Sequence, residues 1–411
     1  MKSKNRKVLI VSASIGAGHN QVAMAIKVAW EMKCPVDQVH IVDFMDSDNS
    51  YLNYLLKETY LKMITVSPDL YKNLYYWTQG SYGMKVQTLL SWIMQKSMEN
   101  LIEQYQPDVI ICTHPFPCGA AAYLKRKEKM NAPLVGVITD FGIHQMWMYP
   151  EIDQYIVATT EMKSELIAQG IPPSLIHETG IPIHPCFASS SNADELSQLL
   201  KLDKTQPILL LMGGGLGLGS IRDLLIHLDH SSFPLQIIAV TGSNRELRED
   251  LEVMAMQSVH TMHIFGNTRH IRELMQLSDI LITKPGAVTI CEALAMELPM
   301  LFFEPIPGQE VDNAAYIVNR GAARWISNCK ISSLDSRNAI DNQISRLFGN
   351  RNELVTMQAA ARLIRQPQSA YDAVRIISQL ANEYIRTQNG APPTMAGEKY
   401  MMGMLGRAKI F

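Results

Sequence analysis

The chain has 411 residues, of which 47% are hydrophobic and 18% are charged. This composition is close to the average of globular proteins, so it excludes a wholly disordered chain, and the length predicts two or three domains that each bury a core. The 37 Lys and Arg residues against 39 Asp and Glu residues give a net charge of −2, which excludes a nucleic-acid-binding protein that works by bulk positive charge.

The cysteines and the longest apolar runs exclude further classes. The six cysteines are scattered, with no C-x-x-C pair and no Cys/His cluster at zinc spacing, so the sequence predicts neither a disulfide framework nor a metal site. The basic start leads into a short apolar run that predicts a first strand and not a signal peptide. No apolar run is long enough for a spanning helix. We therefore expect a cytoplasmic protein that contacts any membrane from outside the bilayer.

Short apolar runs alternate with longer helical patterns along the chain, and this alternation predicts parallel βαβ units. In the first half, the expected strands cover residues 7–13, 39–44, 108–113, 133–139 and 154–158. In the second half, they cover residues 207–212, 235–241, 262–265, 279–283, 300–303 and 322–326. Several runs are apolar from end to end, as in buried parallel strands. The expected fold class is α/β, with two open, doubly wound sheets.

A boundary between the two sheets is expected near residue 187, where prolines and serines interrupt regular structure in 180–192. The expected domains are 1–187 and 188–369, the second completed by helices at about 336–346 and 352–364. A last amphipathic helix over about 370–388 and a tail without clear periodicity make up the remaining segment, 370–411.

The first expected strand leads into a glycine loop. Gly16 and Gly18 bend the chain, and a helix is expected to begin near His19. This arrangement directs a helix N-terminus beyond the carboxyl end of the sheet, where it favours an anion or polar ligand. The spacing matches neither a P-loop nor G-x-G-x-x-G. His19 is placed where a proton acceptor would be useful, although a packing histidine at a helix start is the alternative explanation.

The second half carries two further ligand-binding patterns. Five glycines within seven residues follow the strand 207–212 and indicate close backbone approach to a ligand: Gly213, Gly214, Gly215, Gly217 and Gly219. After Thr283, a Pro-Gly turn starts a helix whose first turn can hold a diphosphate, and Glu292 lies where a carboxylate can accept hydrogen bonds from ribose hydroxyls. The loop after the next strand brings three polar residues to the same end of the sheet, namely Gln309, Glu310 and Asn313. Together these features predict a nucleotide-sugar site.

These segments, with VITDFGIHQMWMYPEIDQYIVATTEMKSELIAQGI and ETGIPIHPCF between them, resemble glycosyltransferase family 28. The closest likeness is to its group of monogalactosyldiacylglycerol synthases and processive diacylglycerol glucosyltransferases. The resemblance covers about Lys7 to Gln388 and implies a GT-B fold, in which two Rossmann-like domains face a central cleft. It also implies inverting transfer from a UDP-sugar, which is a co-substrate, to diacylglycerol at a membrane surface, with no bound metal or other cofactor.

Matched residue by residue, the resemblance implies roles for particular positions. It assigns the glycine–histidine loop to Gly16, Gly18 and His19, and the donor loop to 213–217. It assigns the diphosphate turn to Lys284, Pro285, Gly286 and Ala287, the ribose carboxylate to Glu292, and sugar-hydroxyl and loop contacts to Gln309, Glu310 and Asn313. Plant galactolipid synthases carry three successive glycines before the histidine, whereas this chain has Gly-Ala-Gly. This difference favours the bacterial glucosyltransferases and leaves the sugar open.

Asp140 and His144 follow the expected strand 133–139. Asp140 is a candidate to orient His19 or to bind the acceptor hydroxyl, because a carboxylate often positions a catalytic imidazole. A turn cap is the alternative explanation of Asp140. We group His144 with the acceptor loop.

Aromatic residues are enriched between residues 51 and 100, and lysines are interspersed with them: Lys57, Lys62, Lys72, Lys85 and Lys96. Tyr and Trp favour the membrane–water interface and lysine is attracted to anionic lipid, so this segment predicts contact with an anionic membrane surface. The alternative is that these aromatics are buried in two helices added to the first domain.

We therefore expect an inverting transferase that moves a hexose, glucose by preference, from a UDP-sugar to diacylglycerol on the cytoplasmic face of a membrane. Transfer to another lipid, to a polyprenyl acceptor or to a soluble acceptor remains open. A UDP-sugar sensor without catalysis is the alternative from a different class.

Overall fold

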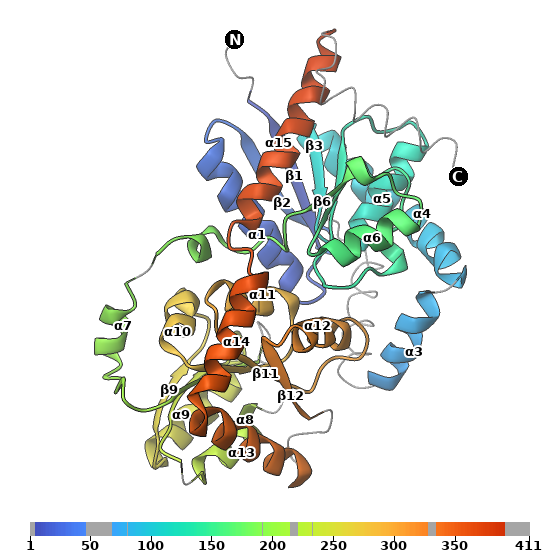
Figure 1. The fold of residues 1–411 in the computed structure, drawn as a ribbon. Helices are drawn as coiled ribbons and strands as arrows, with labels where there is room; N and C mark the ends of the chain where they lie inside the picture. Colours follow the sequence, from blue (N-terminus) through green and yellow to red (C-terminus); the bar gives the residue numbers. More distant parts are fainter. Residues whose placement is uncertain are drawn as a thin grey trace. The chain divides into compact units, whose positions relative to one another are not determined.

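A computed structural model of the chain describes residues 5–46, 68–79, 81–190, 192–213, 221–231, 233–327 and 334–390 (Figure 1). The chain divides into two compact units. The first consists of Met1–Pro185 with Gln368–Phe411, and the second of Cys186–Pro367. Each unit is built on a six-stranded sheet in which every described pair of neighbouring strands is parallel.

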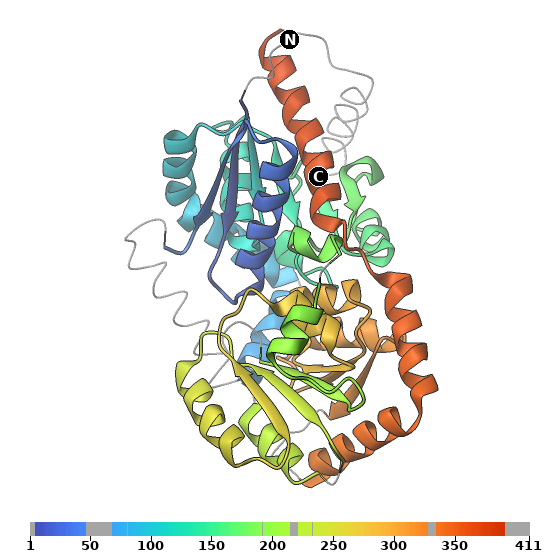
Figure 2. The same ribbon diagram turned by 90° about the vertical axis from the view of Figure 1, so that its left-hand side faces the viewer.

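The sheet of the first unit has the order β2-β1-β3-β4-β5-β6. Its strands are β1 Lys7–Ser12, β2 Gln38–Asp43, β3 Val109–Cys112, β4 Leu134–Val137, β5 Gln154–Val157 and β6 Ile176–Glu178. Its helices are α1 Gly18–Lys33, α3 Pro68–Thr78, α4 Ser81–Tyr105, α5 Pro115–Arg126, α6 Thr160–Ala168 and α15 Ser369–Gln388. Strands β3 and β4 are buried throughout because helices lie on both faces of the sheet (Figures 1 and 2).

Helix α15 is joined to the first unit although it comes last in the chain. It packs along α1, and the guanidinium of Arg6 donates to the carbonyl oxygen of Ser378 and to Oδ1 of Asn382, both at 3.2 Å. The same guanidinium pairs with the buried carboxylate of Asp37 at 2.6 Å, which also accepts from Nε1 of Trp30 at 2.8 Å. The sequence analysis set this helix apart from both domains, whereas these long-range contacts place it in the first unit. Residues 391–411 of the expected tail lie outside the described residues.

The sheet of the second unit has the order β12-β11-β10-β7-β8-β9. Its strands are β7 Ile208–Met212, β8 Gln236–Val240, β9 Thr261–Phe265, β10 Ile280–Thr283, β11 Met300–Phe303 and β12 Ala323–Ser327. Its helices are α7 Asp194–Leu199, α8 Ile221–Asp229, α9 Arg245–Gln257, α10 Ile271–Leu277, α11 Ala287–Ala295, α12 Gln309–Asn319, α13 Leu334–Gly349 and α14 Arg351–Ile364. Aliphatic side chains of the strands, of α8 and of α13 form one buried core.

In both sheets the order of the strands reverses at one point. The reversal lies between β1 and β3 in the first sheet, and between β7 and β10 in the second. In open parallel sheets, ligands bind at the carboxyl ends of the strands that flank such a reversal. The loops after these four strands are therefore where a site is expected in each unit.

Candidate active site

The loop after β1 carries the glycine–histidine pattern. Gly16 has a φ of +89°, in the left-handed region that side chains other than glycine rarely adopt. Helix α1 begins at Gly18, and Ala17 before it provides no side-chain cap. His19 is the second residue of α1 and is half-buried, in the segment that follows β1, a strand that flanks the reversal of the first sheet.

The ring of His19 is held at one nitrogen. Its Nδ1 lies 2.8 Å from the carbonyl oxygen of Thr113, just after β3, and 2.9 Å from Oγ1 of Thr139, after β4. A carbonyl oxygen can only accept, so Nδ1 carries the proton and Nε2 keeps its lone pair. This is the tautomer that a general base requires.

Burial lowers the pKa of His19 below the ordinary 6.5, although the charge of Asp140 and the hydrogen bond to Thr113 act in the opposite direction. The ring is therefore neutral at neutral pH and ready to accept a proton. Asp140 was predicted to orient His19 or the acceptor. The structure brings Asp140 within electrostatic reach of the ring, and brings Thr113 and Thr139, which the sequence analysis did not identify, to Nδ1.

His114 is a second histidine of this centre that the sequence analysis did not identify. Its ring centroid lies 4.6 Å from that of His19, with the two planes at 80°. Its Nδ1 accepts from the backbone N–H of Phe116 at 3.1 Å and caps α5. Burial, followed by the neighbouring His19, holds the pKa of His114 well below its ordinary value. The available sequence signal was a polar residue directly before Pro115, which is typical of a helix start.

In the second unit, two loops of the predicted nucleotide site follow adjacent strands. Thr283 of β10 lies opposite Met212 of β7, and its Oγ1 donates to the Met212 carbonyl oxygen at 2.9 Å. Gly213 and the turn beginning at Lys284 therefore lie side by side at the reversal of this sheet. The predicted donor-loop residues Gly214, Gly215 and Gly217 lie outside the described residues.

The N-terminus of α11 is open. Gly286 is its N-cap and provides no side-chain hydrogen bond, and a Cβ built at Gly286 would have no atom within 4 Å. The N–H groups of the first turn, beginning at Ala287, lack intrahelical partners. Unpaired amide groups at a helix start suit an anionic group such as a diphosphate.

Glu292 lies one turn further along α11. In the part of the chain that the structure describes, its carboxyl group makes no hydrogen bond or ion pair. Burial raises the pKa of Glu292 to about 8. A half-buried carboxyl group without a hydrogen-bond partner among the described residues can accept hydrogen bonds from the hydroxyl groups of a bound ligand.

The three polar residues of the loop before α12 differ in position. Glu310 accepts from the backbone N–H of Ile306 at 2.7 Å and closes the loop, in which Gly308 has a φ of +93°. Asn313 is fully buried and its Nδ2 donates to the Pro285 carbonyl oxygen at 3.3 Å, so it supports the diphosphate turn. Gln309 is the first residue of α12. Contacts of these residues with a sugar stay a prediction.

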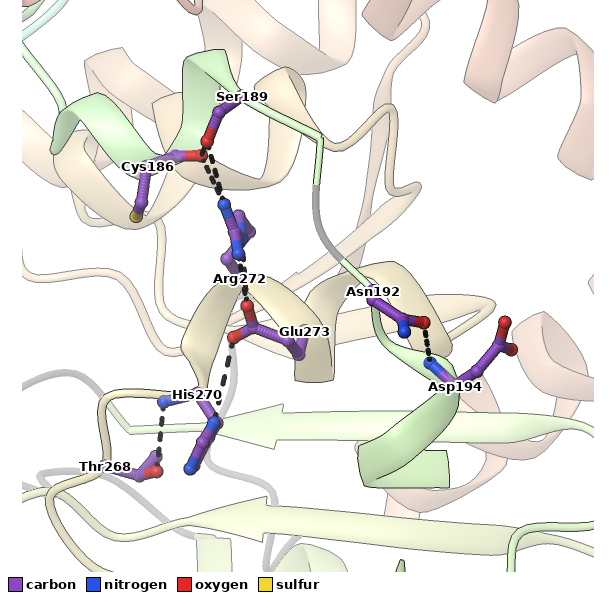
Figure 3. A network of polar contacts seen from close by, with 8 residues as sticks. All are labelled: Cys186, Ser189, Asn192, Asp194, Thr268, His270, Arg272 and Glu273. Atoms are coloured by element: carbon purple, nitrogen blue, oxygen red, sulfur yellow. Dashed lines mark hydrogen bonds and ion pairs between the residues drawn. The ribbon is translucent and has the colours of Figure 1, made fainter. Parts of the chain in front are cut away.

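A polar network fixes the start of the second unit (Figure 3). Arg272 of α10 donates to the Cys186 carbonyl oxygen at 2.8 Å and to Oγ of Ser189 at 3.0 Å, and it pairs with Glu273 at 2.6 Å. Burial raises the pKa of Cys186, and the nearby Glu292 adds to the rise. The segment 186–189 is therefore anchored within electrostatic reach of Glu292. No local sequence pattern indicates this network.

Comparison with known proteins bears on both units. The family model of monogalactosyldiacylglycerol synthases matches residues 19–183, and that of the glycosyltransferase family 28 C-terminal domain matches residues 208–375. A processive diacylglycerol beta-glucosyltransferase of Bacillus cytotoxicus is 33% identical over 376 residues, 91% of this chain and 94% of the relative. The protein of the same name from Bacillus cereus strain G9842 is 34% identical over 322 residues, 78% of this chain and 82% of the relative.

Solved structures share the fold at low sequence identity. MurG of Acinetobacter baumannii has a TM-score of 0.57 at 17% identity and covers 91% of this chain and 99% of its own. Anabaena Alr3699/HepE, solved in complex with UDP-glucose, has a TM-score of 0.53 at 13% identity, with 92% and 99% covered. The expected fold class, two parallel-sheet α/β domains of the GT-B type, is thus confirmed. With the matches to both units, the chain belongs to glycosyltransferase family 28, to the group of monogalactosyldiacylglycerol synthases and processive diacylglycerol glucosyltransferases.

Proposed function

We propose that the chain transfers glucose from UDP-glucose to the hydroxyl group of diacylglycerol, with inversion at the anomeric carbon. Its relatives are named processive diacylglycerol beta-glucosyltransferases, and the chain is a UDP-sugar-dependent hexosyltransferase of that type. The observation that carries the proposed chemistry is the single tautomer of His19, which leaves Nε2 free to accept a proton.

In the proposed mechanism, Nε2 of His19 removes the proton of the acceptor hydroxyl. The acceptor oxygen attacks the anomeric carbon as the bond from that carbon to the diphosphate oxygen breaks, and UDP leaves with the electron pair. The imidazolium that forms is stabilised by the charge of Asp140. We propose that the amide groups at the start of α11, with no resident metal or other cofactor, stabilise the negative charge of the departing UDP.

We further propose that the enzyme works while bound peripherally to an anionic membrane, on its cytoplasmic face. The support is an exposed set of apolar side chains on α3 and α4, which we call the lipid face: Leu70, Leu74, Tyr76, Trp77, Leu89 and Trp92. Lys72 and Lys85 are exposed on the same helices. Among the described residues, no helix has both the length and the apolar character needed to span a bilayer.

Two tryptophans bear on the alternative explanation of the aromatic segment. Trp77 is 50% exposed and Trp92 is 54% exposed, so neither is a core residue in the way that Trp30, with 0% exposure, is. The other residues singled out between positions 51 and 66, including Lys57 and Lys62, lie outside the described residues.

The test of the proposed function is incubation of the purified chain with labelled UDP-glucose or UDP-galactose in mixed micelles of detergent and diacylglycerol. We expect labelled glucosyldiacylglycerol, with products of more than one sugar separated by chromatography. Transfer to a polyprenyl phosphate or to a soluble acceptor, with none to diacylglycerol, would overturn the acceptor assignment. Binding of UDP-glucose without turnover under any of these conditions would identify a sensor.

A further inference from the structure

His144 lies between the lipid face and the loop that carries Asp140. It is the N-cap of the single turn Gln145–Trp147, and its Nδ1 accepts from the backbone N–H of Met146 at 3.2 Å. Its proton is therefore on Nε2, which lies 3.3 Å from the Tyr75 carbonyl oxygen and 3.2 Å from Oγ1 of Thr78. Both ring nitrogens are satisfied in the neutral ring, and only in this tautomer.

The partners of Nε2 form the last turn of α3. The Tyr75 ring packs on the imidazole with 4.7 Å between centroids, and Oγ1 of Thr78 donates to the carbonyl oxygens of Leu74 and Tyr75 at 2.9 Å. Carbonyl groups in the last turn of a helix lack intrahelical donors. His144 thus supplies a further donor to a carbonyl group in the last turn of α3.

Helix α3 is mostly exposed in the part of the chain that the structure describes. Of its described side chains only Thr78 is buried, Tyr75 is half-buried, and the rest are exposed. A surface helix normally buries an apolar stripe against the core, and α3 exposes Leu70 and Leu74 instead. Among the described residues, α3 contacts α4, and its last turn is hydrogen-bonded to His144.

Helix α4 holds the same turn from a second direction. Nε2 of Gln87 donates to the Met148 carbonyl oxygen at 3.1 Å and to the Gln145 carbonyl oxygen at 3.4 Å. Further along, the hydroxyl of Tyr149 lies 3.3 Å from Oγ of Ser91. The two helices that form the lipid face are thus both tied to residues 144–149.

The loop before His144 reaches the catalytic histidine. Burial lowers the pKa of both His19 and His144, and the charge of Asp140 opposes this lowering at each ring, so Asp140 lies within electrostatic reach of both. Among the described residues, the ring of His114 also packs against His19. The chain therefore leads from α3 through His144 and back along residues 139–144 to Thr139, whose Oγ1 lies 2.9 Å from Nδ1 of His19.

We propose that His144 is a positioning residue that couples the lipid face to the catalytic loop, so that contact of α3 with a lipid surface sets Asp140 relative to His19. This inference rests on the proposed function and concerns the regulation of the same site. It predicts that the enzyme is faster on diacylglycerol in a bilayer than on a dissolved diacylglycerol, and that this advantage depends on His144.

The test measures one ratio: the rate on dioleoylglycerol in vesicles of phosphatidylcholine and phosphatidylglycerol, divided by the rate on a dissolved short-chain diacylglycerol. His144→Ala removes two hydrogen bonds, and we expect the ratio to fall about tenfold. His144→Gln keeps a side-chain donor and acceptor and should recover part of the ratio. His177→Ala is the matched control, because this half-buried histidine of β6 has an Nε2 without a hydrogen-bond partner; its ratio should equal that of the wild type.

Vesicle sedimentation and a thermal melt accompany the rates. The proposal predicts that His144→Ala still binds vesicles and stays folded, since the lipid face is unchanged. An unchanged ratio, an equal loss on both acceptors, or a loss of vesicle binding would overturn it, because His144 would then have no role, a role in chemistry alone, or a role only in holding α3. If the wild type glucosylates neither acceptor, the proposed function fails instead.

Discussion

The reversal points of the two sheets have the same topology but opposite chemistry. Between β1 and β3, the protein itself satisfies Nδ1 of His19, through Thr113 and Thr139. At the corresponding place between β7 and β10, the α11 N-terminus has no side-chain cap, and Glu292 makes no hydrogen bond in the described part of the chain. The first centre is organised by the protein itself, whereas we propose that a ligand completes the second.

Burial explains the opposite directions of the two pKa shifts. It disfavours the charged form, so it lowers the pKa of His19 and raises that of Glu292. Both groups are neutral as a result. In the proposed mechanism, neutral His19 is the form that accepts a proton. Neutral Glu292 is the form in which the carboxyl group can hydrogen-bond to a ligand.

The largest expected effect follows from removing the organised base. His19→Ala should reduce turnover about a hundredfold or more, which is typical of a lost general base. UDP affinity, measured by calorimetry, should be nearly unchanged, because the positions proposed for the diphosphate and the ribose belong to the other unit. Near-normal turnover at saturating substrates would reject His19 as the base and make Asp140 the next candidate.

A smaller effect is expected at the centre that the ligand completes. Glu292→Ala removes hydrogen bonds to ribose hydroxyls, so UDP affinity should fall about tenfold or more. The fold should survive, since a buried carboxyl group without a partner is removed. Glu297→Ala is the control: Glu297 follows the same helix and pairs with Arg362 and Arg365, so its loss should leave UDP affinity intact. Unchanged affinity in folded Glu292→Ala would contradict the assignment.

The pH dependence of stability should distinguish the two centres without any substrate. The pKa of Glu292 rises from 4.5 to about 8 on folding, so its contribution is complete below the unfolded value and is lost as the pH rises from 4.5 through 8. His19 has a lowered pKa, so its contribution is lost as the pH falls below 6.5. Chemical denaturation of wild type and Glu292→Gln at pH 5 and pH 8 checks this, with a smaller loss expected in the variant. Equal losses would argue against a buried, neutral Glu292.

The smallest effects concern the lipid face, which only the first unit carries. Changing Lys72 and Lys85 to Ser should weaken binding to anionic vesicles several-fold at low salt, at about 1 kcal/mol per lysine, and much less at high salt. Trp77→Ser and Trp92→Ser should leave the melting temperature nearly unchanged, because both indoles are half exposed. Vesicle binding that does not change with these substitutions or with salt would exclude the electrostatic part of the proposal. A large loss of thermal stability in both Trp variants would show that the two tryptophans pack in the core.

Local patterns predicted the strands and the glycine loops, because each is encoded within a few neighbouring residues. All eleven expected strands are present. Strand β6 was missed, since it has three residues and two of them, His177 and Glu178, are polar. Its pairing with β5 comes from tertiary context.

Local sequence patterns could not predict which residues hydrogen-bond to the site residues. Thr113 and Thr139 lie 94 and 120 residues from His19 in the sequence. No periodic pattern in the sequence indicates that they contact His19. Glu310 closes its own loop by accepting from the Ile306 N–H, and its predicted contact with the sugar stays a prediction. The hydrogen bonds between His144 and α3 also join residues at least 66 positions apart. The sequence therefore indicated that His144 lies in the acceptor loop but did not indicate that it contacts α3.

The position of α15 has a consequence for the order in which the chain acquires its structure during synthesis. The second unit is continuous from Cys186 to Pro367, so it can fold as soon as it leaves the ribosome. The first unit must wait for residues 369–388 to cover α1 and to meet the guanidinium of Arg6, although its own sheet is made first. The half that is translated first is thus the half that matures last, and a nascent chain stopped at residue 367 would leave α1 uncovered and Arg6 without two of its partners.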